Sequence, residues 1–125
     1  MIELVIPTFK RLNKQITLSC IPDELLDTVT LVVQPQEEND ARKVHNKIFV
    51  VSGDNIGFAK TIRDITYEFA VNRQSRFWIL DDDLKFLRHY ETEDGKLRKE
   101  LMTKSDWNEF LSKTETWMDE GFSHG

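Results

Sequence analysis

Apolar residues along the chain gather in short continuous blocks instead of alternating with polar ones. The clearest blocks lie at residues 2–6, 29–34, 47–51 and 77–80. Continuous apolar runs of this length are typical of strands that are covered on both faces. We therefore expect four strands in one sheet, with residues 77–80 forming a central, buried strand.

Polar stretches with helical spacing separate these blocks. Residues 58–72 form the clearest one. Their apolar positions recur every three or four residues, which predicts a helix with this face buried: Phe58, Ile62, Ile65 and Phe69. Residues 11–19 predict another helix, and the very polar residues 36–47 predict a surface loop that can include a short helical turn. This order of elements predicts an α/β fold with a mostly parallel sheet flanked by helices.

The pattern changes after residue 83. Segments 84–90 and 96–102 flank Asp94-Gly95, a favoured two-residue turn, and predict a hairpin. Thr103 or Ser105 is expected to cap a last helix that runs to about residue 120. We expect one domain over residues 1–125, with a sheet-forming part at about 1–90 and the hairpin and helix at about 84–120.

Composition narrows the class of protein. With 125 residues and 39% hydrophobic content, the chain suits one globular domain with a modest core. Its formal charge of −5 argues against a broadly basic surface that coats nucleic acid. Cys20 is the only cysteine, so no internal disulfide can form, and we expect a cytoplasmic protein. Neither a signal peptide nor a membrane span is predicted from the apolar runs.

Three consecutive acids follow the last predicted strand of the sheet. If Asp81, Asp82 and Asp83 continue the extended backbone, Asp81 and Asp83 point the same way and Asp82 points elsewhere. Two carboxylates so placed suit a hard divalent cation such as Mg²⁺, together with water and ligand phosphates. The alternative is a solvated acidic turn whose repulsion is screened by water.

Ligands of open parallel sheets bind beyond the carboxyl ends of the strands. The segments expected there are PTFKR at 7–11, SGDNIG at 52–57 and the acids at 81–83. Gly57 permits a close approach of backbone to ligand, and Asn55 is a candidate cap for the helix that follows. Lys60 and Arg63 share a helix face near that terminus, which attracts anions. The alternative is a well-capped helix with ordinary surface cations.

Taken together and in this order, VIPTFKR, DNIGFAKTIRD and WILDDDL resemble a family of enzymes. They look like the nucleotide-sugar-binding half of a GT-A glycosyltransferase of the large inverting family 2 type, over roughly residues 2–90. The family shows a start like IPTxxR, an NxGxAxxRN-like segment and an acidic DxD triplet. The resemblance implies a Rossmann-like GT-A sheet and transfer of a sugar from a nucleoside-diphosphate sugar, with Mn²⁺ or Mg²⁺ as cofactor.

The resemblance also implies roles for individual residues. Asp81 and Asp83 would bind the metal. Contacts to the nucleotide sugar would come from the first loop, the segment around the second motif and the triplet, namely Pro7, Thr8, Arg11, Asn55, Gly57, Lys60, Arg63, Asp81 and Asp82. Two positions depart from the pattern. Asp64 stands where Asn is common, and Gln34 stands where an acid often meets the base, for which Glu37 is a substitute.

The resemblance does not reach a catalytic base. In the family the base and the acceptor site lie after the region matched, so we expect the acceptor-side half to be missing from these residues. GFSHG resembles the start of that half, which would give His124 a role there. The acceptor is unassigned, a modified base in phage DNA being one candidate. The alternative is a non-catalytic nucleotide-binding or protein-interaction module. A nucleotidyltransferase is disfavoured, because PTFKR is not glycine-rich.

Overall fold

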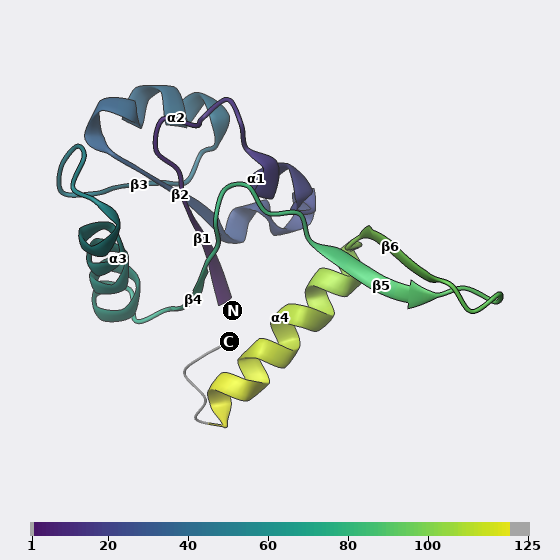
Figure 1. Ribbon diagram of the computed structural model, residues 1–125. Helices are drawn as coiled ribbons and strands as arrows, with labels where there is room; N and C mark the ends of the chain where they lie inside the picture. The colour runs from purple at the N-terminus through teal and green to yellow at the C-terminus, as the bar shows by residue number, and fades with distance from the viewer. Residues whose placement is uncertain (1, 121–125) are drawn as a thin grey trace.

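A four-stranded, all-parallel sheet forms the centre of the fold, in the strand order β3-β2-β1-β4 (Figure 1). A computed structural model describes residues 2–120, apart from the side chains of residues 88–90. The strands are β1 (Ile2–Pro7), β2 (Val29–Val33), β3 (Ile48–Val50) and β4 (Arg76–Ile79). Helices connect them, so the predicted α/β class with a parallel sheet is confirmed.

The connections contain more helix than the sequence predicts. Between β1 and β2 lie α1 (Ile16–Cys20) and a 3₁₀ helix η1 (Asp23–Thr28). The expected helix at 11–19 therefore starts late, after a turn in which Lys14 N–H donates to the Arg11 carbonyl at 2.9 Å. The segment at 36–47, expected to be a surface loop with a short helical turn, has more helix than that, namely a 3₁₀ turn η2 (Pro35–Glu37) followed by α2 (Glu38–Val44). Only Ala41 of α2 is buried, which explains why no apolar periodicity marks it.

The helix predicted at 58–72 is present as α3 (Phe58–Thr66), which continues as a π-helical segment η3 (Tyr67–Asn72). Ile65 and Phe69 are fully buried as predicted. Phe58 is not on the buried face, since 78% of it is exposed. It lies in the first turn of α3 and borders two cavities instead of packing in the core.

Two apolar clusters cover the two faces of the sheet. On one face Val5 and Val32 pack with Ile65 and Phe69 of the α3–η3 segment. On the other face the alternate strand residues pack with the C-terminal helix and η1 in a second cluster, whose buried members include Leu4, Ile6, Val29, Leu31, Leu80 and Trp107. Strands buried on both faces account for the continuous apolar blocks in the sequence.

The segment 77–80 is not the central, buried strand that we expected, since it lies at an edge and only Leu80 of it is buried. β4 pairs only with β1 and lies at the edge of the described sheet, whereas β1 lies between two strands. Phe77 packs against Phe69 on one face, with ring centroids 5.6 Å apart. Trp78 packs against Phe110 on the other, also at 5.6 Å. Coverage by two helical layers makes an edge strand as apolar as a central one, so the pattern does not distinguish them.

The C-terminal part has the predicted hairpin and helix. The hairpin consists of β5 (Leu87–Glu91) and β6 (Leu97–Leu101), with Gly95 at a φ of 81° in its turn. The helix is α4 (Lys104–Asp119), and Thr103 caps it in a capping box with Asp106. Within residues 2–120, no helix is both long and apolar enough to cross a bilayer. The GFSHG segment, with the role expected of His124, lies outside the described residues.

Replacing Ile65 by alanine is expected to lower the free energy of unfolding by about 2–5 kcal/mol, because the fully buried side chain leaves a cavity between α3 and the sheet. Chemical denaturation of the two proteins measures the difference. Ile65→Val removes one methylene and should cost only about 0.5–1.5 kcal/mol. Equal effects of the two variants would contradict the packing of α3 described above.

Candidate functional site

The carboxyl ends of β1 and β4 form the point at which the order of the sheet reverses. From β1 the chain crosses to β2 and β3 on one side and later returns to β4 on the other side of β1. Open α/β sheets bind ligands at such a point, beyond the strand ends. The segments after β1, β3 and β4 meet here, as predicted, and they carry the candidate residues.

A polar cluster joins the loop after β1 to the acids after β4. The Thr8 hydroxyl donates to Asp82 Oδ2 at 2.8 Å and accepts a hydrogen bond from Gln15 Nε2, also at 2.8 Å. Arg11 Nε lies 3.5 Å from Asp82 Oδ2, and Arg11 Nη2 lies 3.9 Å from Asp83 Oδ2. Thr8 is 1% and Asp82 is 7% exposed, so the hydrogen bond between these two side chains is buried.

The acidic triplet is a turn and not a continuation of the strand, because β4 ends at Ile79. Thr17 of α1 holds this turn. Its hydroxyl donates to the Asp81 carbonyl and accepts from Leu84 N–H at 2.7 Å, and its own N–H donates to the Asp82 carbonyl at 3.1 Å. Thr17 is fully buried. Its hydrogen bonds therefore attach the backbone of the acidic triplet to the buried side of α1.

This turn gives the three acids different surroundings. Asp82 points inward to Thr8, whereas Asp81 and Asp83 are exposed. Asp82 therefore differs from its two neighbours in burial, and hydrogen bonding in a turn, not strand alternation, causes the difference. Asp81 lines a cavity described below, whereas Asp83 lies near Arg11, so a shared direction of Asp81 and Asp83 stays a prediction. Arg11 offsets part of the repulsion between Asp82 and Asp83.

A second polar network joins the ends of β1, β2 and β3. The buried Gln34 accepts from Asn55 N–H at 2.9 Å and donates to Glu37 Oε1 at 2.8 Å. Glu37 Oε2 accepts from Lys10 N–H at 2.8 Å. Both carboxylate oxygens of Glu37 therefore bind protein donors, which argues against Glu37 as the residue that meets a nucleobase.

Asn55 is not the helix cap that we expected. The N-cap of α3 is Gly57, at a φ of 86°, with no side-chain cap. Asn55 itself has a positive φ of 53°, and its backbone is tied to Gln34. The loop therefore turns its backbone toward β2, and the Asn55 side chain borders the cavity described next.

Two adjoining cavities lie above the strand ends. One, of about 410 Å³, lies between the loops after β1 and β3, and its lining includes Lys10, Asn55 and Gly57. The other, of about 420 Å³, lies between β1, α3 and β4, and its lining includes Pro7, Ile79 and Asp81. Phe9, Phe58 and Thr61 line both. We refer to the two together as the strand-end cleft.

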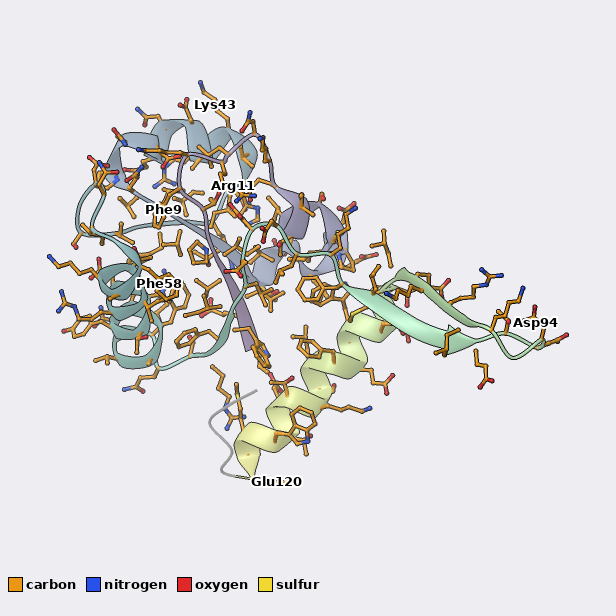
Figure 2. The ribbon with its side chains drawn as sticks, in the orientation of Figure 1. Phe9, Arg11, Lys43, Phe58, Asp94 and Glu120 are labelled. Carbon is orange, nitrogen blue, oxygen red and sulfur yellow. The ribbon has the colours of Figure 1, made fainter. Side chains whose placement is uncertain are left out.

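Two phenylalanines that the sequence did not mark as site residues dominate this cleft. Phe9 follows β1 and Phe58 opens α3, and both lie on the same side of the molecule in Figure 2. A phenylalanine that is 78% exposed beside a cavity is a surface on which a flat ring can stack. The helical spacing of Phe58 predicts a core residue, and only its position in the first turn signals otherwise.

The cations of α3 are not gathered at the cleft. Lys60 is exposed and lines neither of its cavities. Arg63 lines a separate cavity of about 390 Å³ beside β3, with Tyr67 and Glu68. Hydrogen bonds from Asn72 and Arg73 lower the pKa of Glu68 there. Asp64, the departure from the family pattern, accepts from Ser52 N–H at 2.9 Å and so has a structural use.

The available donors decide what metal chemistry the site can support. No group of three or more His, Cys, Asp or Glu side chains in the described part of the chain is placed to hold a metal by itself. Asp81 is the only carboxylate that lines the cleft, and no hydrogen bond or ion pair engages its side chain within residues 2–120. Asp83, the other predicted ligand, lines neither cavity and lies 3.9 Å from Arg11. A Mg²⁺ or Mn²⁺ site here would therefore depend on a ligand's phosphates and water to complete it.

Replacing Thr17 by valine is expected to destabilise the fold by about 1–3 kcal/mol for each group that loses its partner, since the Asp81 carbonyl and the Leu84 N–H both depend on this hydroxyl. Thermal or chemical unfolding measures the loss. Thr17→Ser keeps the hydroxyl and should cost clearly less. Valine as stable as serine at this position would mean that the hydroxyl does not hold the turn.

Comparison of the chain with protein-family models, with curated proteins and with solved structures finds no match. The site is therefore interpreted from its own geometry and chemistry.

Proposed function

We propose that the strand-end cleft binds a nucleoside-diphosphate sugar together with Mg²⁺ or Mn²⁺, and that the chain is the donor-binding half of a glycosyltransferase. The observation that carries the proposal is the cleft itself. It lies at the topological switch point, its walls are largely apolar with two phenylalanines, and its one carboxylate, Asp81, has no partner in the described chain. This combination suits a flat base at one end and a cation-bound diphosphate at the other.

Each part of the cleft would meet a different part of the ligand. Phe58 and Phe9 would stack on the base, with the Asn55 side chain at the polar rim of the same cavity. The diphosphate would lie toward Asp81, near Pro7 and the buried Thr8–Asp82 pair. Asp82 would act by positioning, because its carboxylate is engaged by Thr8 and Arg11.

The chemistry expected of such a site is departure of the nucleoside diphosphate from the sugar. A bound divalent cation would supply Lewis-acid stabilisation of the charge on the leaving diphosphate. Arg11, 44% exposed, can turn from Asp83 toward the phosphates and add a second positive charge. The residues above bind and orient the donor. We assign no residue to the acceptor site or to the catalytic base.

Isothermal titration with UDP, GDP, ADP and CDP, each with and without MnCl₂, tests the proposal. We expect at least one nucleotide to bind only when the metal is present. Phe58→Ala should weaken that binding by roughly 1–3 kcal/mol, the range for one stacked base. Because Phe58 is exposed, its removal should leave the stability of the fold unchanged.

Tyr67→Ala is the matched control, because Tyr67 is also an exposed aromatic residue of the same helical segment but lines a different cavity. It should bind like the wild-type protein. Equal losses in both variants would argue against the cleft as the binding site. Failure of every nucleotide to bind at millimolar concentration with Mn²⁺ would overturn the proposal.

A further inference from the structure

The hairpin β5–β6 forms a two-stranded sheet of its own and does not pair with the four-stranded sheet. It extends away from the sheet and past the start of α4 (Figure 1). All five residues of β6 are exposed, and the leucines of the hairpin are 75% (Leu97), 55% (Leu101) and 41% (Leu87) exposed. A two-stranded hairpin of this kind is marginal in water and gains stability when further strands join it.

The hydrogen bonds of the hairpin show which backbone groups of β6 are available. Thr92 N–H donates to the Lys96 carbonyl, and Met102 N–H donates to the Phe86 carbonyl. Hydrogen-bonded and non-hydrogen-bonded pairs alternate in an antiparallel ladder. Between these two bonds, residues 98 and 100 therefore direct their N–H and C=O groups toward β5. Leu97, Lys99 and Leu101 direct theirs toward the outer edge of β6.

We propose that this edge pairs with the same edge of a second copy of the chain, in an antiparallel, two-fold symmetric arrangement. The order of residues in β6, LRKEL, is complementary to itself when read in the opposite direction. With Lys99 at the two-fold axis, Leu97 lies opposite Leu101 of the second copy. Arg98 lies opposite Glu100 of the second copy, and symmetry repeats both contacts.

The available backbone groups allow three registers, and the side chains favour this one. Outward-facing residues must pair with outward-facing residues, so Lys99 can lie opposite Leu97, Lys99 or Leu101 of the second copy. Pairing with Leu97 would place Arg98 opposite Arg98, and pairing with Leu101 would place Glu100 opposite Glu100. The register centred on Lys99 joins opposite charges within β6, at the non-hydrogen-bonded positions, where opposed side chains lie closest. In the Leu97 register the opposite-charge pair is Glu100 with Lys96, which lies before the start of β6.

The same register gathers the leucines. Leu87 pairs with Leu101 within the hairpin, and Leu101 would then adjoin Leu97 of the second copy on the same face. Leu87, Leu101 and Leu97 of the second copy would form a row across three of the four strands of an antiparallel sheet, and the second copy's Glu91 would end it. The unfavourable contact of this register is between the like charges of Lys99 and Lys99 of the second copy, at the two-fold axis. An interface of two short strands is small, so we expect a weak, concentration-dependent dimer.

Sedimentation equilibrium over a concentration series up to about 1 mM, a range suited to weak association, tests the pairing. The wild-type chain should dimerise with rising concentration. Arg98→Glu and Glu100→Arg should each stay monomeric, because each variant opposes like charges twice. An equimolar mixture of the two should form a heterodimer, since the glutamates of one variant would face the arginines of the other. Lys43→Glu, on the exposed face of α2, should dimerise like the wild type.

A variant that acts on the backbone tests the edge independently of charge. Lys99→Pro removes an outward N–H that the hairpin does not use, so β5 and β6 should still pair while the dimer is lost. A wild-type chain that stays monomeric would overturn the proposal. The proposal also fails if the mixture stays monomeric, or if Lys99→Pro folds and still dimerises.

Discussion

Replacing Trp107 by alanine is expected to lower the free energy of unfolding by about 3–5 kcal/mol, a large part of the total stability of a domain of this size. Trp107 is fully buried and belongs to the core cluster that joins α4 to the sheet. Its ring lies against Phe86, at a centroid distance of 4.6 Å, and against Phe110, at 6.3 Å. Removing it leaves a cavity where α4, the start of the hairpin and the sheet meet. Equilibrium unfolding in urea, followed by circular dichroism, measures the loss.

Trp107→Phe is the informative comparison. The indole Nε1 of Trp107 is buried without a hydrogen-bond partner in the described chain. Phenylalanine removes this unsatisfied donor while it keeps most of the ring, so it should cost much less than alanine. A loss below about 0.5 kcal/mol for Trp107→Ala would mean that α4 is not docked on the sheet in solution.

The parts of the fold that follow from periodicity could be predicted, and those that depend on pairing could not. The steps between Ile62, Ile65 and Phe69 predict the helix and its buried face, and Asp94-Gly95 predicts the hairpin turn. The polar helix α2 escapes prediction because only Ala41 of it is buried. The edge position of β4 could not be predicted from the sequence. The apolar pattern of a strand reflects the layers above and below it, and not the number of its neighbours within the sheet.

At the candidate site, the topology could be predicted but the direction of individual side chains could not. A parallel sheet brings the ends of β1, β3 and β4 together, so Pro7, Asn55 and Asp81 border the same cleft. Arg63 lines the separate cavity beside β3 instead, although the helix begins at the predicted residue. Long-range hydrogen bonds such as Thr8 to Asp82 span 74 positions of sequence, and no local pattern carries them.

Replacing Asp81 by asparagine is expected to abolish metal-dependent nucleotide binding if the proposed function is correct. Asparagine keeps the shape of the side chain and removes the charge that a divalent cation requires. The effect should exceed the roughly 10–100-fold losses seen for groups that only support a metal ligand. Isothermal titration with and without MnCl₂ measures it. Asp83→Asn should act the same way, since Asp83 is the second exposed carboxylate of the turn.

Asp82→Asn separates this explanation from a purely structural one. The buried Asp82 carboxylate accepts from Thr8 and pairs with Arg11, so asparagine there should destabilise the fold. Asp81→Asn and Asp83→Asn should leave the unfolding temperature unchanged or raise it slightly, because they relieve repulsion among neighbouring acids. If the turn is merely a solvated surface feature, no protein in the set will show metal-dependent binding. If Asp81→Asn still binds a nucleotide with Mn²⁺ as tightly as the wild type, the cation lies elsewhere.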